Sequence, residues 1–589
     1  MLRTFLRSRS GLSLVEVIIA IALVGMLFGS IYLSYFSIID VVNNSKHRAQ
    51  AASLMNKEIE LIRNIPYDSI GTIGGIPDGI IPAAKNVTAD DGNVYELTFT
   101  IRNIDDPFDG TIGGSPNDTA PADYKLVEIR AACLSCARFL PLSITTTVAP
   151  KSLESASSDG SIFINVFDAS AQGVSAAAVH VINTSTVPSI DLTDTTNASG
   201  VLQLVGVPTS SQSYYIQVSK SGYSSERTYA IGYAGNPNPL PQYTHATVQA
   251  QTLTTASFSI DRLSSLQVLT NDYLCQPIGG RTISLQGAKN IGTDVYKNSL
   301  SSTTDSNGLF LVPTLEWDTY TLTLQGSTYD IVGTIPLTPL VIDPNTSRSV
   351  RFVLQSADPN SLLITVKDAV SSAVIPSSTV VITGSGISAS GTTARATYAE
   401  TNWSSYETQS GGVDTSAPGT LDLLAGVDGY PTSTTEWLIS NTIDFGGATT
   451  TFYTLTWNPT SQPAQTGADS LKFQIASNND NATWDFIGPD GTGSTFYTTS
   501  GTALHSSHNG DRYLRYKVHL STADENFTPE LADVAIMFLG PCVPPGQVFF
   551  SGLSSDDYTV QASASGYATA TTSVTVSGSG SVELNLISL

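Results

Sequence analysis

One carboxylate lies inside an otherwise apolar segment near the N-terminus. Residues 12–39 read LSLVEVIIAIALVGMLFGSIYLSYFSII and contain a single charged residue, Glu16. As a helix this segment would extend roughly 42 Å, which is enough to cross a bilayer with some tilt. Arg3, Arg7 and Arg9 precede it without an acidic residue, so the N-terminus is expected on the cytoplasmic side. Because an unpaired carboxylate in hydrocarbon is costly, Glu16 is a candidate for pairing with a cation.

Ordinary targeting signals explain this segment poorly. The apolar run is too long for the core of a secretory signal, and no A-x-A-like cleavage site follows it. Cysteine is absent from its neighbourhood, which excludes a lipoprotein site. A plain signal anchor would fit the length and the arginines, but it gives Glu16 no role.

The junction SRSG–LSLVEV resembles the leader junction of type IV prepilins and of type II secretion pseudopilins. In this resemblance Gly11 is the last leader residue, Leu12 is the first mature residue and Glu16 is the fifth. Leu12 stands where the family most often has Phe. The resemblance implies that a prepilin peptidase cleaves after Gly11 and methylates the amino group of Leu12. It also implies that Glu16 pairs with the N-terminal ammonium of a neighbouring subunit during assembly.

The four cysteines fall into one close pair and two distant residues. Cys133 and Cys136 form C-L-S-C, with no further ligands nearby for zinc and no helix start to activate a thiol. Outside the cytoplasm a local disulfide could join them, and two free thiols are the alternative. The pairing of Cys275 and Cys542 cannot be deduced from their positions.

Other polar groups give no catalytic or metal site. The Gly/Pro-rich loop from Asp105 to Asp123 could bind Ca²⁺, but its spacing is not that of an EF-hand, and a solvated acidic turn is the preferred interpretation. His505 and His508 form H-S-S-H in a Gly/Ser loop and are interpreted as surface residues. The motifs H-E-x-x-H, G-x-S-x-G and the P-loop do not occur. We therefore expect no enzyme, no metal and no cofactor.

The elements that carry the N-terminal motif are a long helix and a small β head. Apolar residues continue at helical spacing beyond the membrane segment until Pro66, at Ala49, Ala52, Leu54, Ile59 and Ile62. The sequence thus predicts a leader at 1–11, a helix over 12–64 and a pilin-like head of three or four antiparallel strands over 65–150.

The rest of the chain contains repeats. Residues 161–184 align without gaps to 361–384, and a shorter version begins at 264. The downstream halves 193–223, 303–326 and 546–567 also match one another. These units resemble carboxypeptidase regulatory-like domains, which implies transthyretin-like β-sandwiches without catalytic residues. The predicted sandwiches cover 157–263, 264–357, and 361–386 together with 543–589.

The third sandwich is split by an inserted domain, which is predicted over 387–542 and has a jelly-roll-like strand pattern. Four of the five tryptophans lie in it: Trp403, Trp437, Trp457 and Trp484. Exposed tryptophans could stack on sugar rings. The alternation of Tyr453, Leu455 and Trp457 favours a core position instead.

Composition completes the prediction. The 589 residues carry 50 acidic and 27 basic side chains, a net charge of −23, which argues against nucleic acid as a partner. The predicted fold class is mainly β with one long N-terminal α-helix, a pilin-like α+β head and a string of antiparallel β-sandwiches.

The predicted function is that of a minor type IV pilin-like subunit. It would be a single-pass protein of the inner membrane that is later assembled into a pilus, where it presents β-domains for adhesion. Expected partners are the prepilin peptidase, other pilin subunits, the assembly machinery of a pilus or of type II secretion, the membrane, and a surface glycan or protein. The alternatives are a type II secretion pseudopilin and an anchored surface protein that never polymerises.

Overall fold

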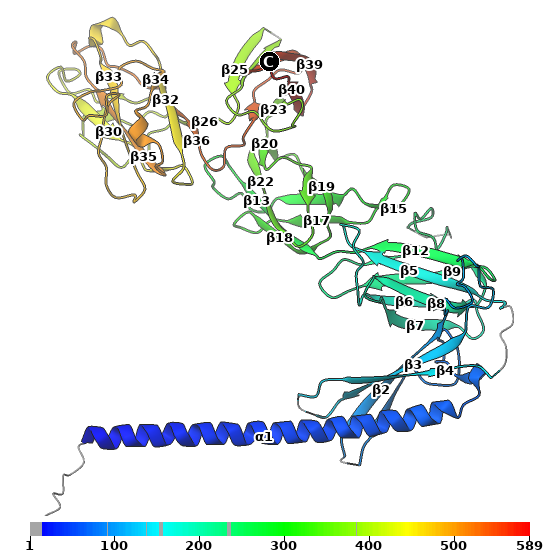
Figure 1. The fold of residues 1–589 in the computed structure, drawn as a ribbon. Helices are drawn as coiled ribbons and strands as arrows, with labels where there is room; N and C mark the ends of the chain where they lie inside the picture. Colours follow the sequence, from blue (N-terminus) through cyan, green and yellow to red (C-terminus); the bar gives the residue numbers. More distant parts are fainter. Residues whose placement is uncertain (1–13, 91, 137, 152–156, 233–236, 385) are drawn as a thin grey trace, which may run out of the picture. The chain divides into compact units, whose positions relative to one another are not determined.

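The computed structural model describes residues 14–589 except 91, 137, 152–156, 233–236 and 385. One α-helix precedes forty strands in this part of the chain (Figure 1). The residues divide into two compact units. The first runs to Arg262 and includes Asn290–Val295, and the second comprises Leu263–Lys289 and Tyr296–Leu589. The observed fold is mainly β with one long N-terminal helix, as predicted.

The first unit begins with α1 (Leu14–Arg63), which ends one turn before Pro66. A short 3-10 turn, η1 (Tyr67–Ser69), follows. The second half of α1 packs on an antiparallel sheet of order β1-β2-β3-β4. The strands are β1 (Ala84–Thr88), β2 (Val94–Ile104), β3 (Tyr124–Cys133) and β4 (Leu142–Val148). The helix buries Ala51, Met55, Ile59 and Ile62 there, whereas Ala49, which the sequence placed on this face, is exposed.

A first sandwich completes this unit. One sheet has the order β12-β5-β8, and the other has the order β10-β9-β6-β7 with β11 also paired to β9. Their bounds are β5 (Gly160–Phe167), β6 (Ala178–Asn183), β7 (Ile190–Thr195), β8 (Val201–Val207), β9 (Ser210–Ser219), β10 (Glu226–Arg227), β11 (Ala246–Val248) and β12 (Leu253–Ser259). Alternate residues of β5 point into the core, so Ile162, Ile164 and Val166 are buried.

The second unit opens with a sandwich of the same design, with sheets β18-β13-β22-β20 and β17-β14-β19-β21. Their bounds are β13 (Ser264–Asn271), β14 (Thr282–Gly287), β17 (Ser299–Thr303), β18 (Leu309–Leu315), β19 (Asp318–Leu324), β20 (Tyr329–Ile335), β21 (Leu340–Ile342) and β22 (Ser347–Ser356). Strands β15 (Asn290–Gly292) and β16 (Val295–Tyr296) form a separate two-stranded ribbon.

A third sandwich has sheets β37-β23-β40 and β25-β24-β38-β39. Its strands are β23 (Ser361–Asp368), β24 (Thr379–Gly384), β25 (Ile387–Thr392), β37 (Gln547–Phe550), β38 (Asp556–Ser563), β39 (Ala570–Val576) and β40 (Ser579–Leu586). In all three sandwiches the first strand pairs in parallel with the last, as β5 with β12, β13 with β22 and β23 with β40. The other strand pairs of the sandwiches are antiparallel.

One glycine recurs at the same place in the three sandwiches. Gly200, Gly308 and Gly546 all have positive φ, and a Cβ on any of them would lie within 2.5 Å of a neighbouring atom. The carbonyl of each accepts a hydrogen bond from the first strand, in the pairs Val166–Gly200, Thr270–Gly308 and Val366–Gly546. The three positions are therefore structurally equivalent.

This equivalence locates the insertion. Residues 197–199 precede the glycine in the first sandwich and 305–307 precede it in the second. In the third sandwich the same turn holds residues 394–545. Thr393, just before it, corresponds to Thr196, because the hydroxyl of each accepts from a backbone N–H at the start of the second strand. Because β25 pairs with β24, the boundary that the sequence suggested at residue 387 lies inside the third sandwich.

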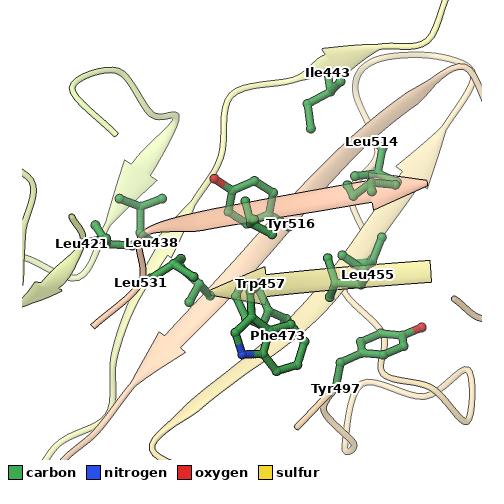
Figure 2. Close-up of a cluster of buried hydrophobic side chains, with 14 of the residues drawn as sticks. Leu421, Leu438, Ile443, Leu455, Trp457, Phe473, Tyr497, Leu514, Tyr516 and Leu531 are labelled. Atoms are coloured by element: carbon green, nitrogen blue, oxygen red, sulfur yellow. The ribbon is translucent and has the colours of Figure 1, made fainter. Parts of the chain in front are cut away.

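The inserted domain has two antiparallel sheets around one apolar core. They are β26-β36-β32-β34 and β27-β30-β35-β31, with β33 paired to β35. Their bounds are β26 (Ala396–Glu400), β27 (Thr408–Gln409), β30 (Glu436–Ile439), β31 (Ile443–Asp444), β32 (Thr451–Asn458), β33 (Leu471–Asn478), β34 (Thr502–Ala503), β35 (Tyr513–Leu520) and β36 (Asp533–Leu539). The small elements are the ribbon β28 (Val413–Asp414) with β29 (Asp422–Leu423), and the 3-10 turns η2 (Ala464–Thr466) and η3 (Ser506–His508). Figure 2 shows Trp457, Phe473 and Tyr516 in the core between the sheets.

Candidate functional site

The helix α1 has two halves of different character. From Leu14 to Val42 its large apolar side chains are exposed, whereas its second half is covered by the head sheet. Among the described residues, α1 from Val17 onward is the one helix long and apolar enough to cross a membrane. Gly11 and Leu12 lie outside the described residues, and so does the side chain of Glu16. The structure thus shows the helix that carries the motif, and the roles of these three residues stay predictions.

Two lysines, the half-buried Lys85 and the buried Lys125, hold the end of α1 and the following turn on the sheet. Lys85 Nζ lies 2.5 Å from the Glu58 carboxylate, which is nearly buried. Lys125 Nζ donates to the carbonyls of Tyr67 and Ile70, at 2.8 and 2.7 Å. Burial lowers the pKa of Lys125. Both ammonium groups satisfy oxygen atoms that would otherwise be buried without a partner.

Two loops of the head share a motif that the sequence interpretation missed. Residues 71–77 read GTIGGIP and residues 110–116 read GTIGGSP. Both loops contain a cis proline, and the side chain after that proline accepts a hydrogen bond from the first glycine of the G-G pair. Asp78 Oδ1 accepts from Gly74 N at 2.9 Å, and Asn117 Oδ1 accepts from Gly113 N at 2.6 Å. The repeated G-T-I-G-G-x-P letters were the signal that could have identified these loops.

Both loops contact the first sandwich. Ile76 is part of the sandwich core, and Gly74 O accepts from Asp191 N at 2.8 Å. A Cβ on Gly113 would lie 3.4 Å from Leu253, so the second loop rests against β12. Arg102 of β2 pairs with Asp194 of β7, with Nε 2.6 Å from Oδ2. The head and the first sandwich are therefore held together by apolar, backbone and ionic contacts.

Both cysteine pairs are disulfide-bonded in the structure. Cys133–Cys136 closes the turn after β3, next to Tyr95 and Phe139. Cys275–Cys542 joins the turn after β13 of the second sandwich to the end of the inserted domain. Tyr273, in the same turn as Cys275, packs against the core of the insert. This second bond, across 267 residues, ties the insert to a neighbouring sandwich.

The acidic loop and the histidine pair have ordinary structural partners. Asp105 Oδ2 accepts from Ile112 N at 2.9 Å, and burial is the main cause that raises the pKa of Asp105. The surface interpretation is wrong for His508, which is buried, with Nδ1 2.8 Å from Ser477 Oγ. His505 is half-buried, and its Nδ1 contacts Ser507 Oγ at 2.8 Å. Within the described residues no group of three or more His, Cys, Asp or Glu is arranged to hold a metal ion.

The four tryptophans of the insert divide into two pairs. Trp403 and Trp457 are only 2% and 3% exposed and belong to its core, as the sequence favoured. The core interpretation is wrong for Trp437 and Trp484, which are half-buried on the outer side of the β30–β35–β33 sheet. Cationic side chains lie over the rings of this second pair.

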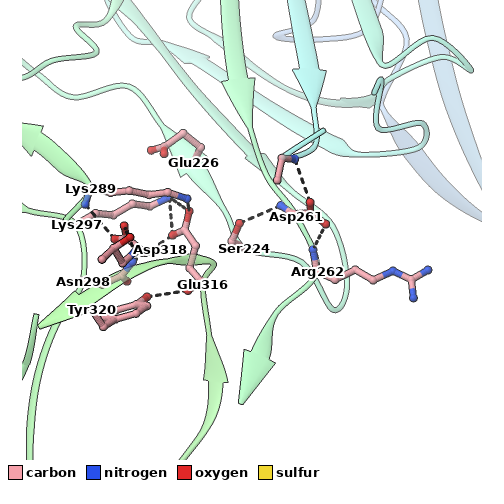
Figure 3. Close-up of polar contacts among 12 residues, drawn as sticks. Ser224, Glu226, Asp261, Arg262, Lys289, Lys297, Asn298, Glu316, Asp318 and Tyr320 are labelled. Carbon is pink, nitrogen blue, oxygen red and sulfur yellow. Dashed lines mark hydrogen bonds and ion pairs between the residues drawn. The ribbon is translucent and has the colours of Figure 1, made fainter. Parts of the chain in front are cut away.

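A cluster of charged and polar side chains lies in the second sandwich and has a structural role. Figure 3 shows Lys289 and Lys297 both directed at the carboxylate of Glu316, with Nζ–Oε1 distances of 2.9 and 2.8 Å. Asn298 Nδ2 also donates to Glu316, and Tyr320 donates from its hydroxyl to the Glu316 carbonyl at 2.8 Å. Asp318 acts on Lys289 as a second carboxylate, so the two lysines and two carboxylates of this group compensate one another.

Among known protein families, one model matches the N-terminal segment of this chain. Residues 6–32 match the model of the prokaryotic N-terminal methylation motif. A search of curated proteins found no match.

Solved structures, several of them of pilins, are detected at low similarity. The Bacillus anthracis TIE protein has 10% identity and a TM-score of 0.16, over 84% of this chain and 71% of that one. GBS52, the minor pilin of Streptococcus agalactiae, has 12% identity and a TM-score of 0.17, over 33% and 96%. The shaft pilin SpaA of Lactobacillus rhamnosus GG has 9% identity and a TM-score of 0.13, over 34% and 98%. At such scores these likenesses carry no conclusion about this chain.

The methylation motif continues into a long helix whose first half is apolar and exposed and whose second half packs on a four-stranded head. This arrangement is pilin-like: the methylation motif leads into a long helix that packs on a small β head, and β-sandwich domains follow.

Proposed function

We propose that this chain is a minor type IV pilin-like subunit that is cleaved after Gly11, methylated at Leu12 and assembled into a filament through α1. The observation that carries the proposal is the exposed apolar half of α1, joined to the matched motif. Each Å² of apolar surface left in water costs about 25 cal/mol, so this half requires lipid and then other helices around it.

Several features support the placement of the remaining domains outside the cytoplasm. The leader contains Arg3, Arg7 and Arg9, which favour a cytoplasmic N-terminus. Two disulfides are typical of an oxidising compartment. The β-sandwiches are too bulky for a regular position in a helical shaft, which favours a low-copy or tip position. There they would contact a surface glycan or protein, and we assign the chain no catalytic activity.

Processing is tested by making the full chain with and without its prepilin peptidase and measuring the intact mass and the N-terminal sequence. We expect a chain that begins at methylated Leu12 only when the peptidase is present. A chain that still begins at Met1 would show a static anchor and overturn the proposal.

Assembly is tested separately with Glu16→Ala. We expect processing to continue and the amount of subunit in sheared surface filaments to fall about tenfold or more, because the carboxylate no longer pairs with a neighbouring ammonium. The matched control is Glu60→Ala on the same helix, where the carboxylate is exposed. A type II secretion pseudopilin would give a different result. Both variants would then stay in the cell envelope, and Glu16→Ala would abolish the secretion of an exported protein.

A further inference from the structure

The outer side of the β30–β35–β33 sheet in the inserted domain carries a row of cations and aromatic rings. We call the following seven half-buried residues the cation–aromatic face: Trp437, Lys472, Trp484, Phe496, Arg515, Lys517 and His519. Arg515, Lys517 and His519 alternate along β35 with Leu514, Tyr516, Val518 and Leu520, which are buried in the core. The period of two in a strand thus places all three polar side chains on the side away from the core.

Strand register brings the remaining members beside β35. Trp437 of β30 and Lys472 of β33 are both opposite His519, on its two sides. Lys517 Nζ lies 4.4 Å from the centre of the Trp437 ring, and Arg515 Cζ lies 4.3 Å from that of Trp484. Each ring is therefore held in place by a cation and remains partly open to solvent.

The third pair completes the row. Lys472 Nζ lies 4.4 Å from the centre of the Phe496 ring, and Phe496 packs edge-on against His519 at 5.1 Å. The polar positions Arg515, Lys517 and His519 thus repeat along β35 about every 7 Å, the rise of two residues in a strand. The row is an extended surface and not a closed pocket.

Positive charge on this face is incompletely neutralised. Arg515 pairs with the exposed Glu407 at 3.1 Å. In the described part of the chain neither Lys472 nor Lys517 forms an ion pair with a carboxylate. His519 is affected by this charge: its pKa is lowered to about 4, mainly by burial and then by Lys517 and Lys472. In a chain of net charge −23, two unpaired lysines beside one another are a local exception.

We propose that the cation–aromatic face binds an acidic polysaccharide that contains uronic acid residues. The lysines and Arg515 would contact the carboxylates, while the rings of Trp437, Trp484 and Phe496 would pack against the apolar faces of the sugars.

A polysaccharide fits this face better than an acidic peptide does. Extended peptides bind to sheets by adding to an edge, through main-chain hydrogen bonds. The cation–aromatic face is instead the side-chain surface over β35, which is a central strand paired on both sides. This site is independent of α1, so it does not rest on the proposed role in a filament.

Binding is tested with the full chain in non-ionic detergent at low salt. The probes are polygalacturonate and hyaluronate, with methyl-esterified polygalacturonate as the uncharged polymer and poly-glutamate as the acidic peptide. We expect both polyuronates to bind, the esterified polymer to bind at least tenfold more weakly, and salt to weaken the binding of the polyuronates.

Two variants connect that binding to the face. Lys472→Gln with Lys517→Gln should weaken polyuronate binding about tenfold or more, and Trp437→Leu should weaken it without improving poly-glutamate binding. The matched control is Lys220→Gln, because Lys220 lies 4.9 Å over the ring of Tyr223 in the first sandwich. Unchanged melting temperatures would show that the variants fold.

The proposal is overturned by any of three results. These are absence of binding to both polyuronates, equal binding by the double lysine variant, and poly-glutamate binding as tight as that of the polyuronates. The last result would identify the face as a docking surface for acidic proteins.

Discussion

At the residue scale, His508 makes the stability of the inserted domain depend on pH. Its side chain is 2% exposed, its Nε2 has no hydrogen-bond partner, and Ser477 links its Nδ1 to Asp511. Burial, followed by the charge of His505, lowers the pKa of His508 to about 4. An unfolded histidine titrates near pH 6.5. Between pH 6.5 and 4 the unfolded chain therefore binds a proton that the folded domain does not.

We predict that acid destabilises the insert in this pH window. The free energy of unfolding should fall by about 3 kcal/mol on account of His508 between pH 6.5 and 4, with no contribution from it above that window. Unfolding by urea, followed by tryptophan fluorescence at several pH values, measures the slope. His508→Gln should remove about half of this slope. The other half comes from His519, whose pKa is also lowered to about 4.

The control for this slope is His180→Gln in the first sandwich. His180 is 38% exposed and contacts the exposed Asp191, so its replacement should leave the transition of the insert unchanged. If the wild-type chain and His508→Gln decline with the same slope, His508 is not the group responsible.

At the scale of elements, the contact between the head and the first sandwich includes one buried ion pair besides its apolar and backbone contacts. Arg102 of β2 binds both carboxylate oxygens of Asp194 in β7, and Asp194 is 9% exposed. Arg102→Met would leave this carboxylate buried without its counter-ion. We predict a loss of about 3 kcal/mol in the free energy of unfolding of this unit.

Calorimetry measures the consequence. The head and first sandwich should unfold in one transition in the wild-type chain and in two transitions in Arg102→Met. Arg63→Met is the matched control, since Arg63 pairs with Glu60 on the exposed side of α1 and should contribute less than about 1 kcal/mol. Two transitions already present in the wild-type chain would contradict a single cooperative unit.

Elements with a strong local pattern were the ones that could be predicted. The gapless repeat at 161–184 and 361–384 is occupied by β5 with β6 and by β23 with β24, because alternating burial constrains both copies in the same way. The insertion was recognised from the interrupted repeat. Its start was misplaced, because Ile387–Thr392 pairs with β24 and no local signal distinguishes that strand from those of the insert.

Contacts between distant segments could not be predicted. Cys275 and Cys542 are joined only because the end of the insert lies on the turn after β13. The cation–aromatic face exists only because β30 and β33 pair with β35 in one particular register. The processing motif, by contrast, could be predicted, because its residues are contiguous in the sequence. The matched model covers residues 6–32.

At the scale of the whole molecule, the N-terminal helix and the inserted domain are separate parts of the chain. The inserted domain takes the place of one turn in the third sandwich. In the first two sandwiches that turn is three residues long, 197–199 and 305–307, and in the third it holds 394–545. Thr393 and Gly546 flank the insert and keep the hydrogen bonds of their counterparts. Next to them, Ala394 N donates to Gln547 O at 3.2 Å, as Asn197 N does to Val201 O in the first sandwich. The third sandwich therefore needs only a turn at this place.

We predict that the insert can be removed without unfolding the sandwich that carries it. Residues 394–545 would be replaced by Asn-Ala-Ser, the sequence of 197–199, together with Cys275→Ala because Cys542 is lost and Ala171 occupies the equivalent turn with positive φ. The melting temperature of the third sandwich should stay within about 5 °C of its original value, as calorimetry can measure. Processing at Gly11 and incorporation through α1 should be unchanged, whereas polyuronate binding should disappear. Unfolding of the third sandwich in this variant would show that the insert is part of its core, and retained polyuronate binding would place the glycan site elsewhere.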